Sequence, residues 1–174
     1  MNTIRFSPNF KNFLTLLKIK RVDYLLVGGY AVQYYGYPRT TRDLDIWTAI
    51  HPLNAMKMVD VFQNFGAGMS QITADPFQHE NRIIRIEVPP LNVEILNPII
   101  GQKPESILQF RGNQTDQIEI LTVQSGVKFE SCFPERVVDI LDGVEVNIIC
   151  LVHLQAIKRA GSRPKDIDEL AHLS

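Results

Sequence analysis

The sequence predicts one α+β domain, a class in which strands and helices pack around a single core. Three observations predict it: apolar residues recur at helical spacing in several segments, short buried runs end at glycine or proline turns, and a helical stretch closes the chain. The chain has 174 residues, enough for one compact domain, and its 45% hydrophobic and 21% charged content supports a core and excludes global disorder.

The first part of the chain alternates between helix and strand. A helix is expected to begin at Ser7-Pro8, with the serine as its cap and the proline in its first turn. Apolar side chains then recur along one helix face, at Phe10, Phe13, Leu14 and Leu17. The elements expected next are a strand at 24–27 that ends in Gly-Gly, a short helix at 30–35, a turn at 36–38, a strand at 43–48 and a helix at 52–65.

The second part is richer in strands and ends in helices. The expected elements are strands at 82–88 and 92–96, a loop at 98–116 with a helical turn near 106–110, a strand at 117–122, and an extended or irregular segment at 127–133. Asp142-Gly143 predicts a hairpin between strands at 137–141 and 144–148. Helices are expected at 151–160 and from Pro164 onward, so that 151–174 is a helical segment of a single domain spanning 1–174.

Charge and composition limit the classes of function. The net charge of −1 gives no overall attraction to nucleic acid. Cys132 and Cys150 are expected to be buried thiols rather than a disulfide framework or a zinc site. The four histidines show no metal-ligand spacing to one another, and His153 is expected to pack within a helix. The N-terminus lacks a signal-peptide profile and no apolar run is long enough to span a bilayer, so we expect a soluble, cytoplasmic protein without a membrane partner.

The most informative feature is a pair of carboxylates, Asp43 and Asp45, at the start of a predicted strand. Residues two apart on a strand project to the same face, so the two acids lie side by side. Like charges at this distance repel unless a cation lies between them. Oxygen ligands of this kind suit Mg²⁺, which often completes its coordination with phosphate oxygens.

Gly28-Gly29 ends the strand before this pair. Glycine lets the backbone approach a phosphate closely, and a helix that begins there favours anions at its N-terminus. An isolated Gly-Gly is more often a turn, and an isolated Asp-x-Asp is more often a solvated edge. The order of strand, Gly-Gly, short helix and Asp-x-Asp is more specific, and it indicates chemistry on a nucleoside triphosphate.

The same segments resemble the nucleotidyltransferase superfamily, whose fold is that of DNA polymerase β. The resemblance is carried by Val27-Gly-Gly-Tyr-Ala31 and by Gly36-Tyr-Pro-Arg-Thr-Thr-Arg-Asp-Leu-Asp-Ile-Trp47. It continues at 88–96, 119–130 and 158–170, and so spans nearly the whole chain. Within the superfamily it is nearest to the bacterial branch related to AbiEii-type abortive-infection toxins. The fold that this implies is a small mixed sheet flanked by helices, with a helical C-terminal segment.

The resemblance implies a transfer of a nucleoside monophosphate from a nucleoside triphosphate to an acceptor, with Mg²⁺ or Mn²⁺ as the cofactor. Asp43 and Asp45 would bind the metal, and Gly28 and Gly29 would contact the triphosphate. Support for the site would come from two further residues, Arg39 and Thr41.

Family members carry a third carboxylate on a later strand, and two positions match it here. Glu94 follows Pro89-Pro90 as the family pattern does, whereas Glu119 precedes the residues that normally come next. We favour Glu94, because its predicted hairpin with 82–88 is local. The residues between, about 97–117, would then be an insertion. Glutamate is one methylene longer than the usual aspartate, which shifts the carboxylate by about an ångström.

A basic cluster near the C-terminus is the second candidate binding region. The resemblance implies that Lys158, Arg163 and Asp166 act at the nucleotide, while Arg159 and Lys165 are expected to be surface residues. A solvated helix end is the alternative for the whole cluster.

Three classes of function remain open. The first is a nucleotidyltransferase acting on tRNA, a protein or a small molecule, with a toxin role that would imply an antitoxin partner. The second is a catalytically degenerate fold that binds a nucleotide or a partner. The third is a modifier of small molecules such as antibiotics. The fold alone does not distinguish them.

Overall fold

The computed structural model describes residues 3–66, 72–80, 82–88, 92–97, 105–108, 116–121 and 126–173. Within these ranges the strands form one mixed sheet in the order β5-β4-β3-β6-β2-β1-β8-β7. Their bounds are β1 Tyr24–Val27, β2 Asp43–Thr48, β3 Ile83–Val88, β4 Asn92–Asn97, β5 Glu105–Leu108, β6 Asp116–Leu121, β7 Val137–Leu141 and β8 Val144–Ile148. The predicted α+β class is therefore confirmed.

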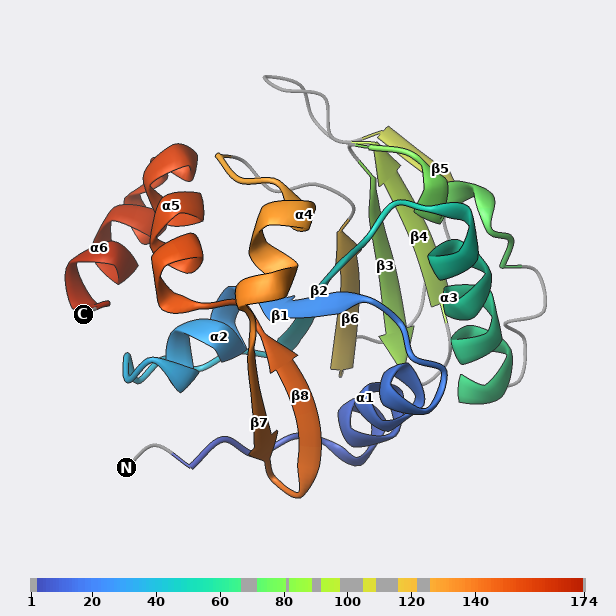
Figure 1. Cartoon of the computed structure of the whole chain (residues 1–174), viewed down its shortest axis with the longest axis horizontal. Coiled ribbons are helices and arrows are strands. Elements are labelled where there is room, and N and C mark those ends of the chain that lie inside the picture. Colours follow the sequence, from blue (N-terminus) through green and yellow to red (C-terminus); the bar gives the residue numbers. More distant parts are fainter. Residues whose placement is uncertain are drawn as a thin grey trace.

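The helices lie around this sheet. They are α1 Pro8–Ile19, α2 Gly28–Tyr34, α3 Pro52–Phe65, α4 Phe129–Cys132, α5 Leu151–Gly161 and α6 Pro164–His172, with 3₁₀ turns η2 Asp75–Gln78 and η3 Phe133–Glu135. Figure 1 shows α5 and α6 at one end of the molecule and β3, β4 and β5 at the other. The expected cap of the first helix is present, since the Ser7 hydroxyl accepts the Phe10 N–H at 3.2 Å.

Two expectations for local structure were wrong. The segment 127–133 is not extended, because Phe129–Cys132 forms α4, where the Phe129 ring packs edge-on against Trp47 with centroids 5.2 Å apart. The expected helical turn near 106–110 is instead β5, Glu105–Leu108, which pairs antiparallel with β4. Pairing with the edge of the preceding strand overrode the local pattern. The remainder of the loop expected at 98–116 lies mostly outside the described residues.

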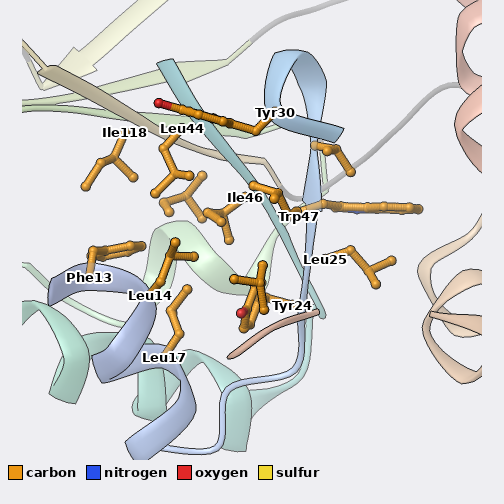
Figure 2. Packing of buried hydrophobic residues seen from close by; sticks show 14 of the residues in the cluster. Phe13, Leu14, Leu17, Tyr24, Leu25, Tyr30, Leu44, Ile46, Trp47 and Ile118 are labelled. Atoms are coloured by element: carbon orange, nitrogen blue, oxygen red, sulfur yellow. The ribbon is translucent and has the colours of Figure 1, made fainter. Parts of the chain in front are cut away.

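The core lies where the central strands meet α1 and α3. Figure 2 shows Leu44, Ile46 and Ile118 of the sheet on the same side as Phe13, Leu14 and Leu17 of α1, whereas Leu25 lies on the other side of β1 near Trp47. Trp47 is 1% exposed and belongs to the same buried hydrophobic cluster. β1 is buried along its whole length, whereas β2 alternates between half-buried and buried residues at 43–46. This alternation favours one register for β2, because a slip by one residue would exchange its two faces.

The N-terminal segment is fastened to the β7–β8 hairpin by Asp142. Asp142 and Gly143 have φ values of 49° and 83°, as the predicted two-residue turn requires. The Asp142 carboxylate accepts the Phe6 N–H at 2.9 Å, and it pairs with Arg5 at 2.9 Å and Lys11 at 3.1 Å. These contacts join residues far apart in the sequence.

No helix in the ranges described above is both long and apolar enough to cross a bilayer.

Asp142 should make stability depend on acid pH. The Phe6 N–H, followed by Lys11 and Arg5, lowers the pKa of Asp142 to about 2, although burial acts in the opposite direction. A lowered folded-state pKa gives stability that is present above the ordinary pKa near 4 and is lost as pH falls toward 2. Asp142→Asn keeps a side chain that tolerates positive φ. It should lower the urea midpoint at pH 6 and have little effect at pH 2; an equal loss at both pH values would contradict this role.

Candidate active site

The sheet brings three carboxylates together at the ends of neighbouring strands. β2 pairs antiparallel with β1, with Val27 opposite Asp45, and parallel with β6, with Asp45 opposite Glu119. Asp43 lies two residues before Asp45 on β2, so both project to one face. The carboxylates of Asp45 and Glu119 are hydrogen-bonded to each other.

Their proximity shifts the proton equilibria of both aspartates. Burial, then the charge of Glu119 and its hydrogen bond, raise the pKa of Asp45 to about 8, with Asp43 adding to the effect. Burial and then the charge of Glu119 also raise the pKa of Asp43, against the opposing charges of Arg85, Lys165 and Arg39. Both aspartates therefore hold a proton more readily here than they would in water.

The preference for Glu94 as the third carboxylate is not supported by the strand order. Glu94 lies on β4 and Glu119 on β6, each opposite Arg85 on the intervening strand β3. Two strands thus separate Glu94 from β2, a distance of about 14 Å at the usual strand spacing of about 4.8 Å. Glu119 lies on the strand next to β2. The predicted hairpin of 82–88 with 92–96 is present as β3 and β4. It lies on the far side of β6 from β2, away from Asp43 and Asp45.

Arg85 holds Glu119 from the other side. Its Nε and a terminal guanidinium nitrogen donate to Glu119 Oε1 at 3.1 and 3.0 Å. Because the two side chains come from opposed positions on β3 and β6, the register itself sets this pair. Neither the sequence spacing nor the resemblance indicated a role for Arg85.

The two glycines pack where no side chain would fit. Gly28 has φ +67°, and a Cβ there would lie 2.0 Å from Asp45 Oδ2. A Cβ on Gly29 would lie 2.6 Å from Thr41 Oγ1, and that hydroxyl donates to the Asp43 carbonyl at 3.2 Å. The glycines thus let the start of α2 come directly against β2, and Thr41 supports both segments. The contact of Gly28 and Gly29 with a triphosphate, which the sequence suggested, stays a prediction.

The basic cluster lies opposite the carboxylates and is held by a buried ion-pair network. Lys158 pairs with Glu169 at 2.7 Å and with Asp166 at 3.4 Å, and the side chains of all three are at most 7% exposed. Arg39 pairs with the same Glu169, which links the segment before β2 to α6.

Asp166 connects the ion-pair network to Arg163 at the start of α6. Its carboxylate accepts Arg163 Nε at 2.8 Å and the Arg163 backbone N–H at 3.3 Å, which caps α6. Burial alone would raise its pKa, but Arg163 and Lys158 lower the pKa of Asp166 on balance. Asp166 therefore positions cations, while Arg163 keeps a 71% exposed side chain.

A cavity of about 260 Å³ joins the two sets of charges. The charged residues that line it are Asp43, Asp45, Glu119, Arg39, Lys158, Arg163 and Lys165, and Gly28 and Gly29 form part of its wall. Lys165, which the sequence analysis left on the surface, is thus a site residue. Its position in the first turn of α6, two residues after Arg163, is the signal that could have identified it.

The carboxylates fit a divalent cation that keeps part of its water shell. The ligand atoms of Asp43, Asp45 and Glu119 do not all lie within 4.8 Å of one another. Mg²⁺ retains several waters and commonly uses only one or two protein carboxylates with substrate phosphates, so this open arrangement is compatible with it. Burial and then the charge of Glu119 raise the pKa of Asp45, and a bound cation would act in the opposite direction because it favours the ionised carboxylate.

Comparison with solved structures identifies the fold. The chain matches the lincosamide antibiotic adenylyltransferase LnuA in its lincomycin-bound form, with a TM-score of 0.52 and 13% identity over 99% of this chain and 98% of that one. It also matches a protein from Thermotoga maritima provisionally assigned as a nucleotidyltransferase, with a TM-score of 0.50 and 13% identity over 94% and 88% of the two chains. The chain has the nucleotidyltransferase fold.

Both matches cover nearly the full length of the solved structure. At 13% sequence identity, however, they show a shared fold and nothing about function. No protein-family model and no curated protein sequence matches the chain. The AbiEii-type branch of the nucleotidyltransferase fold, suggested by the sequence, is therefore not confirmed.

Without divalent metal, Asp45 should make the protein less stable as pH rises. A folded-state pKa raised from 3.8 to about 8 gives stability that is complete below the ordinary pKa and is lost as pH rises through the folded value. We therefore expect the wild type, measured in EDTA, to lose stability relative to Asp45→Asn between pH 4 and pH 8. The measurement is the free energy of unfolding of each protein at both pH values. A difference that stays constant with pH would contradict the raised pKa.

Mg²⁺ should stabilise the wild type at pH 8. A ligand at a hundredfold excess over its Kd adds about 2.7 kcal/mol, which raises Tm by several degrees. Asp45→Asn should lose most of this rise, and a full rise in the variant would place the metal elsewhere.

Gly28→Ala should disrupt the site for a reason that Gly143→Ala does not share. Both glycines have positive φ, but a Cβ at Gly143 would meet nothing within 4 Å, whereas one at Gly28 would meet Asp45. Both variants should lose about 1 kcal/mol or more from backbone strain. Only Gly28→Ala should also lose the rise in Tm with Mg²⁺; equal responses would show that the contact with Asp45 is unimportant.

Proposed function

We propose that this protein transfers a nucleoside monophosphate from a nucleoside triphosphate to an acceptor, with Mg²⁺ or Mn²⁺ at Asp43 and Asp45. The observation that carries the proposal is the cavity in which three carboxylates face four cations. Carboxylates suit the metal, and cations suit the phosphate groups of the same substrate. The nucleotidyltransferase fold is consistent with this assignment.

The reaction is a displacement at the α-phosphorus. An acceptor oxygen forms the new bond to phosphorus, the bond from the α-phosphorus to the oxygen that bridges to the β-phosphate breaks, and pyrophosphate leaves with that electron pair. The bound metal would neutralise the phosphate oxygens and orient them for displacement. The proton of the acceptor hydroxyl would pass to a carboxylate, for which we propose Glu119, next to Asp45 in the sheet.

The remaining residues have distinct proposed roles. The backbone of Gly28 and Gly29 would approach the triphosphate, because no side chain intervenes there. Lys165 and Arg163 would bind phosphate oxygens from the opposite wall. Lys158 and Arg39 line the same wall but are engaged with Glu169, so they would act mainly by fixing its shape.

The acceptor would be tRNA, a protein hydroxyl or a small molecule. The net charge of −1 makes a large nucleic-acid footprint unfavourable, so tRNA would depend on the cations around the cavity. If the AbiEii-type resemblance is functional, expression should arrest growth, and an antitoxin protein should relieve the arrest.

One observation favours a second candidate, a nucleotide-binding protein without transfer activity. Glu119 stands where the resemblance leads one to expect aspartate, and it is hydrogen-bonded to Asp45. A carboxylate misplaced by about an ångström can lower a rate about a hundredfold.

The direct test is transfer of label from each α-labelled nucleoside triphosphate, with Mg²⁺, to total RNA, total protein or candidate small molecules. Wild type should label one acceptor class, and Asp45→Asn should reduce labelling at least about a hundredfold. Mg²⁺-dependent nucleotide binding without transfer would support the second candidate instead. Absence of both would refute the proposed site.

A matched pair of variants tests the third carboxylate. Glu119→Gln should reduce transfer as strongly as Asp45→Asn, because Glu119 lies on the strand next to β2. Glu94 lies two strands farther out in the sheet, so Glu94→Gln should keep a transfer rate within about twofold of the wild-type rate. The reverse order would restore Glu94 as the catalytic residue.

A further inference from the structure

A second cluster of metal-binding residues lies away from the carboxylate site. Among the described residues, one trio of His, Cys, Asp or Glu has ligand atoms that all lie within 4.8 Å of one another, and it consists of Glu135, Cys150 and His153. Glu135 ends the 3₁₀ turn η3, while Cys150 and His153 open α5. None of the three lines the carboxylate cavity.

The ligand atoms of the trio lie near one another, with one ring nitrogen of His153 counted as its ligand atom. Cys150 Sγ lies 3.1 Å from His153 Nδ1, whereas Glu135 Oε2 lies 3.8 Å from the other ring nitrogen, Nε2. A histidine would bind the ion through one of these nitrogens, and the atoms that the three residues offer lie within 4.8 Å of one another. In a tetrahedral zinc site with the usual bond lengths, neighbouring ligand atoms lie about 3.4–3.6 Å apart. Small side-chain rotations, on the order of an ångström, would therefore bring all three ligand atoms around one ion.

The local structure places two of the proposed ligands on one helix end. Cys150 is the N-cap of α5, an 11-residue helix. His153 follows one turn later, so the helix holds the sulfur and the imidazole on adjacent positions of the same end. The Glu135 side chain is 68% exposed and can rotate toward them, while His153 is 17% exposed.

We propose that Glu135, Cys150 and His153 form a binding site for a thiophilic divalent metal ion of the Zn²⁺ class. Thiolate, imidazole and carboxylate are the ligand set that Zn²⁺ takes, and a water would complete four-coordination. The site is separate from the oxygen-only carboxylates of β2 and β6, which suit Mg²⁺.

Metal at this position would fasten the start of α5 to the turn that follows α4, and Figure 1 shows these segments next to each other. α5 also supplies Leu154, Ile157 and Lys158 to the carboxylate cavity. The site would thus stabilise the helix that forms one wall of the nucleotide pocket, without supplying a ligand to the substrate.

Titration of the metal-free full-length chain with Co²⁺ tests the proposal, because a cobalt–thiolate bond gives a charge-transfer absorption band. Wild type should bind one Co²⁺ with this band, and Zn²⁺ should displace it. Cys150→Ser should abolish the band, and His153→Gln and Glu135→Gln should each weaken Co²⁺ binding at least about tenfold.

Three controls keep the result specific. Cys132 is a buried thiol that does not belong to the trio, so Cys132→Ala should keep the band. Glu130→Gln, an exposed glutamate on α4, should bind Co²⁺ as wild type does. Asp45→Asn should also keep the band, which separates this site from the proposed catalytic metal. The assignment would be overturned if the wild type, folded with a normal melting transition, gave no band. It would also be overturned if the band remained in Cys150→Ser.

Discussion

The site depends on one constraint, which is the register of β1, β2 and β6. That register places Asp45 beside Glu119 and against Gly28, in a half-buried position where two ionised carboxylates repel. The repulsion between the two carboxylates destabilises the fold, so the arrangement points to a functional role. A cation bound between the carboxylates would relieve the repulsion most simply. The raised pKa of Asp45 and the open shape of the cavity both follow from this placement.

On the wall of the cavity opposite the carboxylates, buried acidic residues form ion pairs with basic residues and so fix their positions. Buried Glu169 and Asp166 engage Lys158, Arg39 and Arg163, and so join α5, α6 and the segment before β2. Breaking one partner of such a network leaves an uncompensated buried charge, which is strongly destabilising. The network therefore sets the distance between the cations and the carboxylates, while the exposed Arg163 head group remains available to a ligand.

Much of the fold could be predicted because it follows from local pattern. The two-residue period places Asp43 and Asp45 on one face, Asp142-Gly143 specifies its turn, and Ser7 caps its helix. The third carboxylate could not be assigned this way, since Glu94 and Glu119 have similar local sequences and differ only in strand order. Strand order is set by packing between distant segments. For the same reason the sequence did not reveal Arg85, Lys165 or the grouping of Glu135 with Cys150 and His153.

The proposed function requires Asp43 and Asp45 to hold a divalent metal at a nucleotide, with Glu119 beside them as the proton acceptor. The most direct measurement is a crystal structure of the wild type with Mn²⁺ and a non-hydrolysable nucleoside triphosphate, in which anomalous scattering locates the metal. We expect a peak within bonding distance of Asp43 and Asp45, with Glu119 adjacent and the triphosphate along Gly28 and Gly29. A nucleotide bound elsewhere, or a metal coordinated by Glu94 and not by the β2 aspartates, would contradict it.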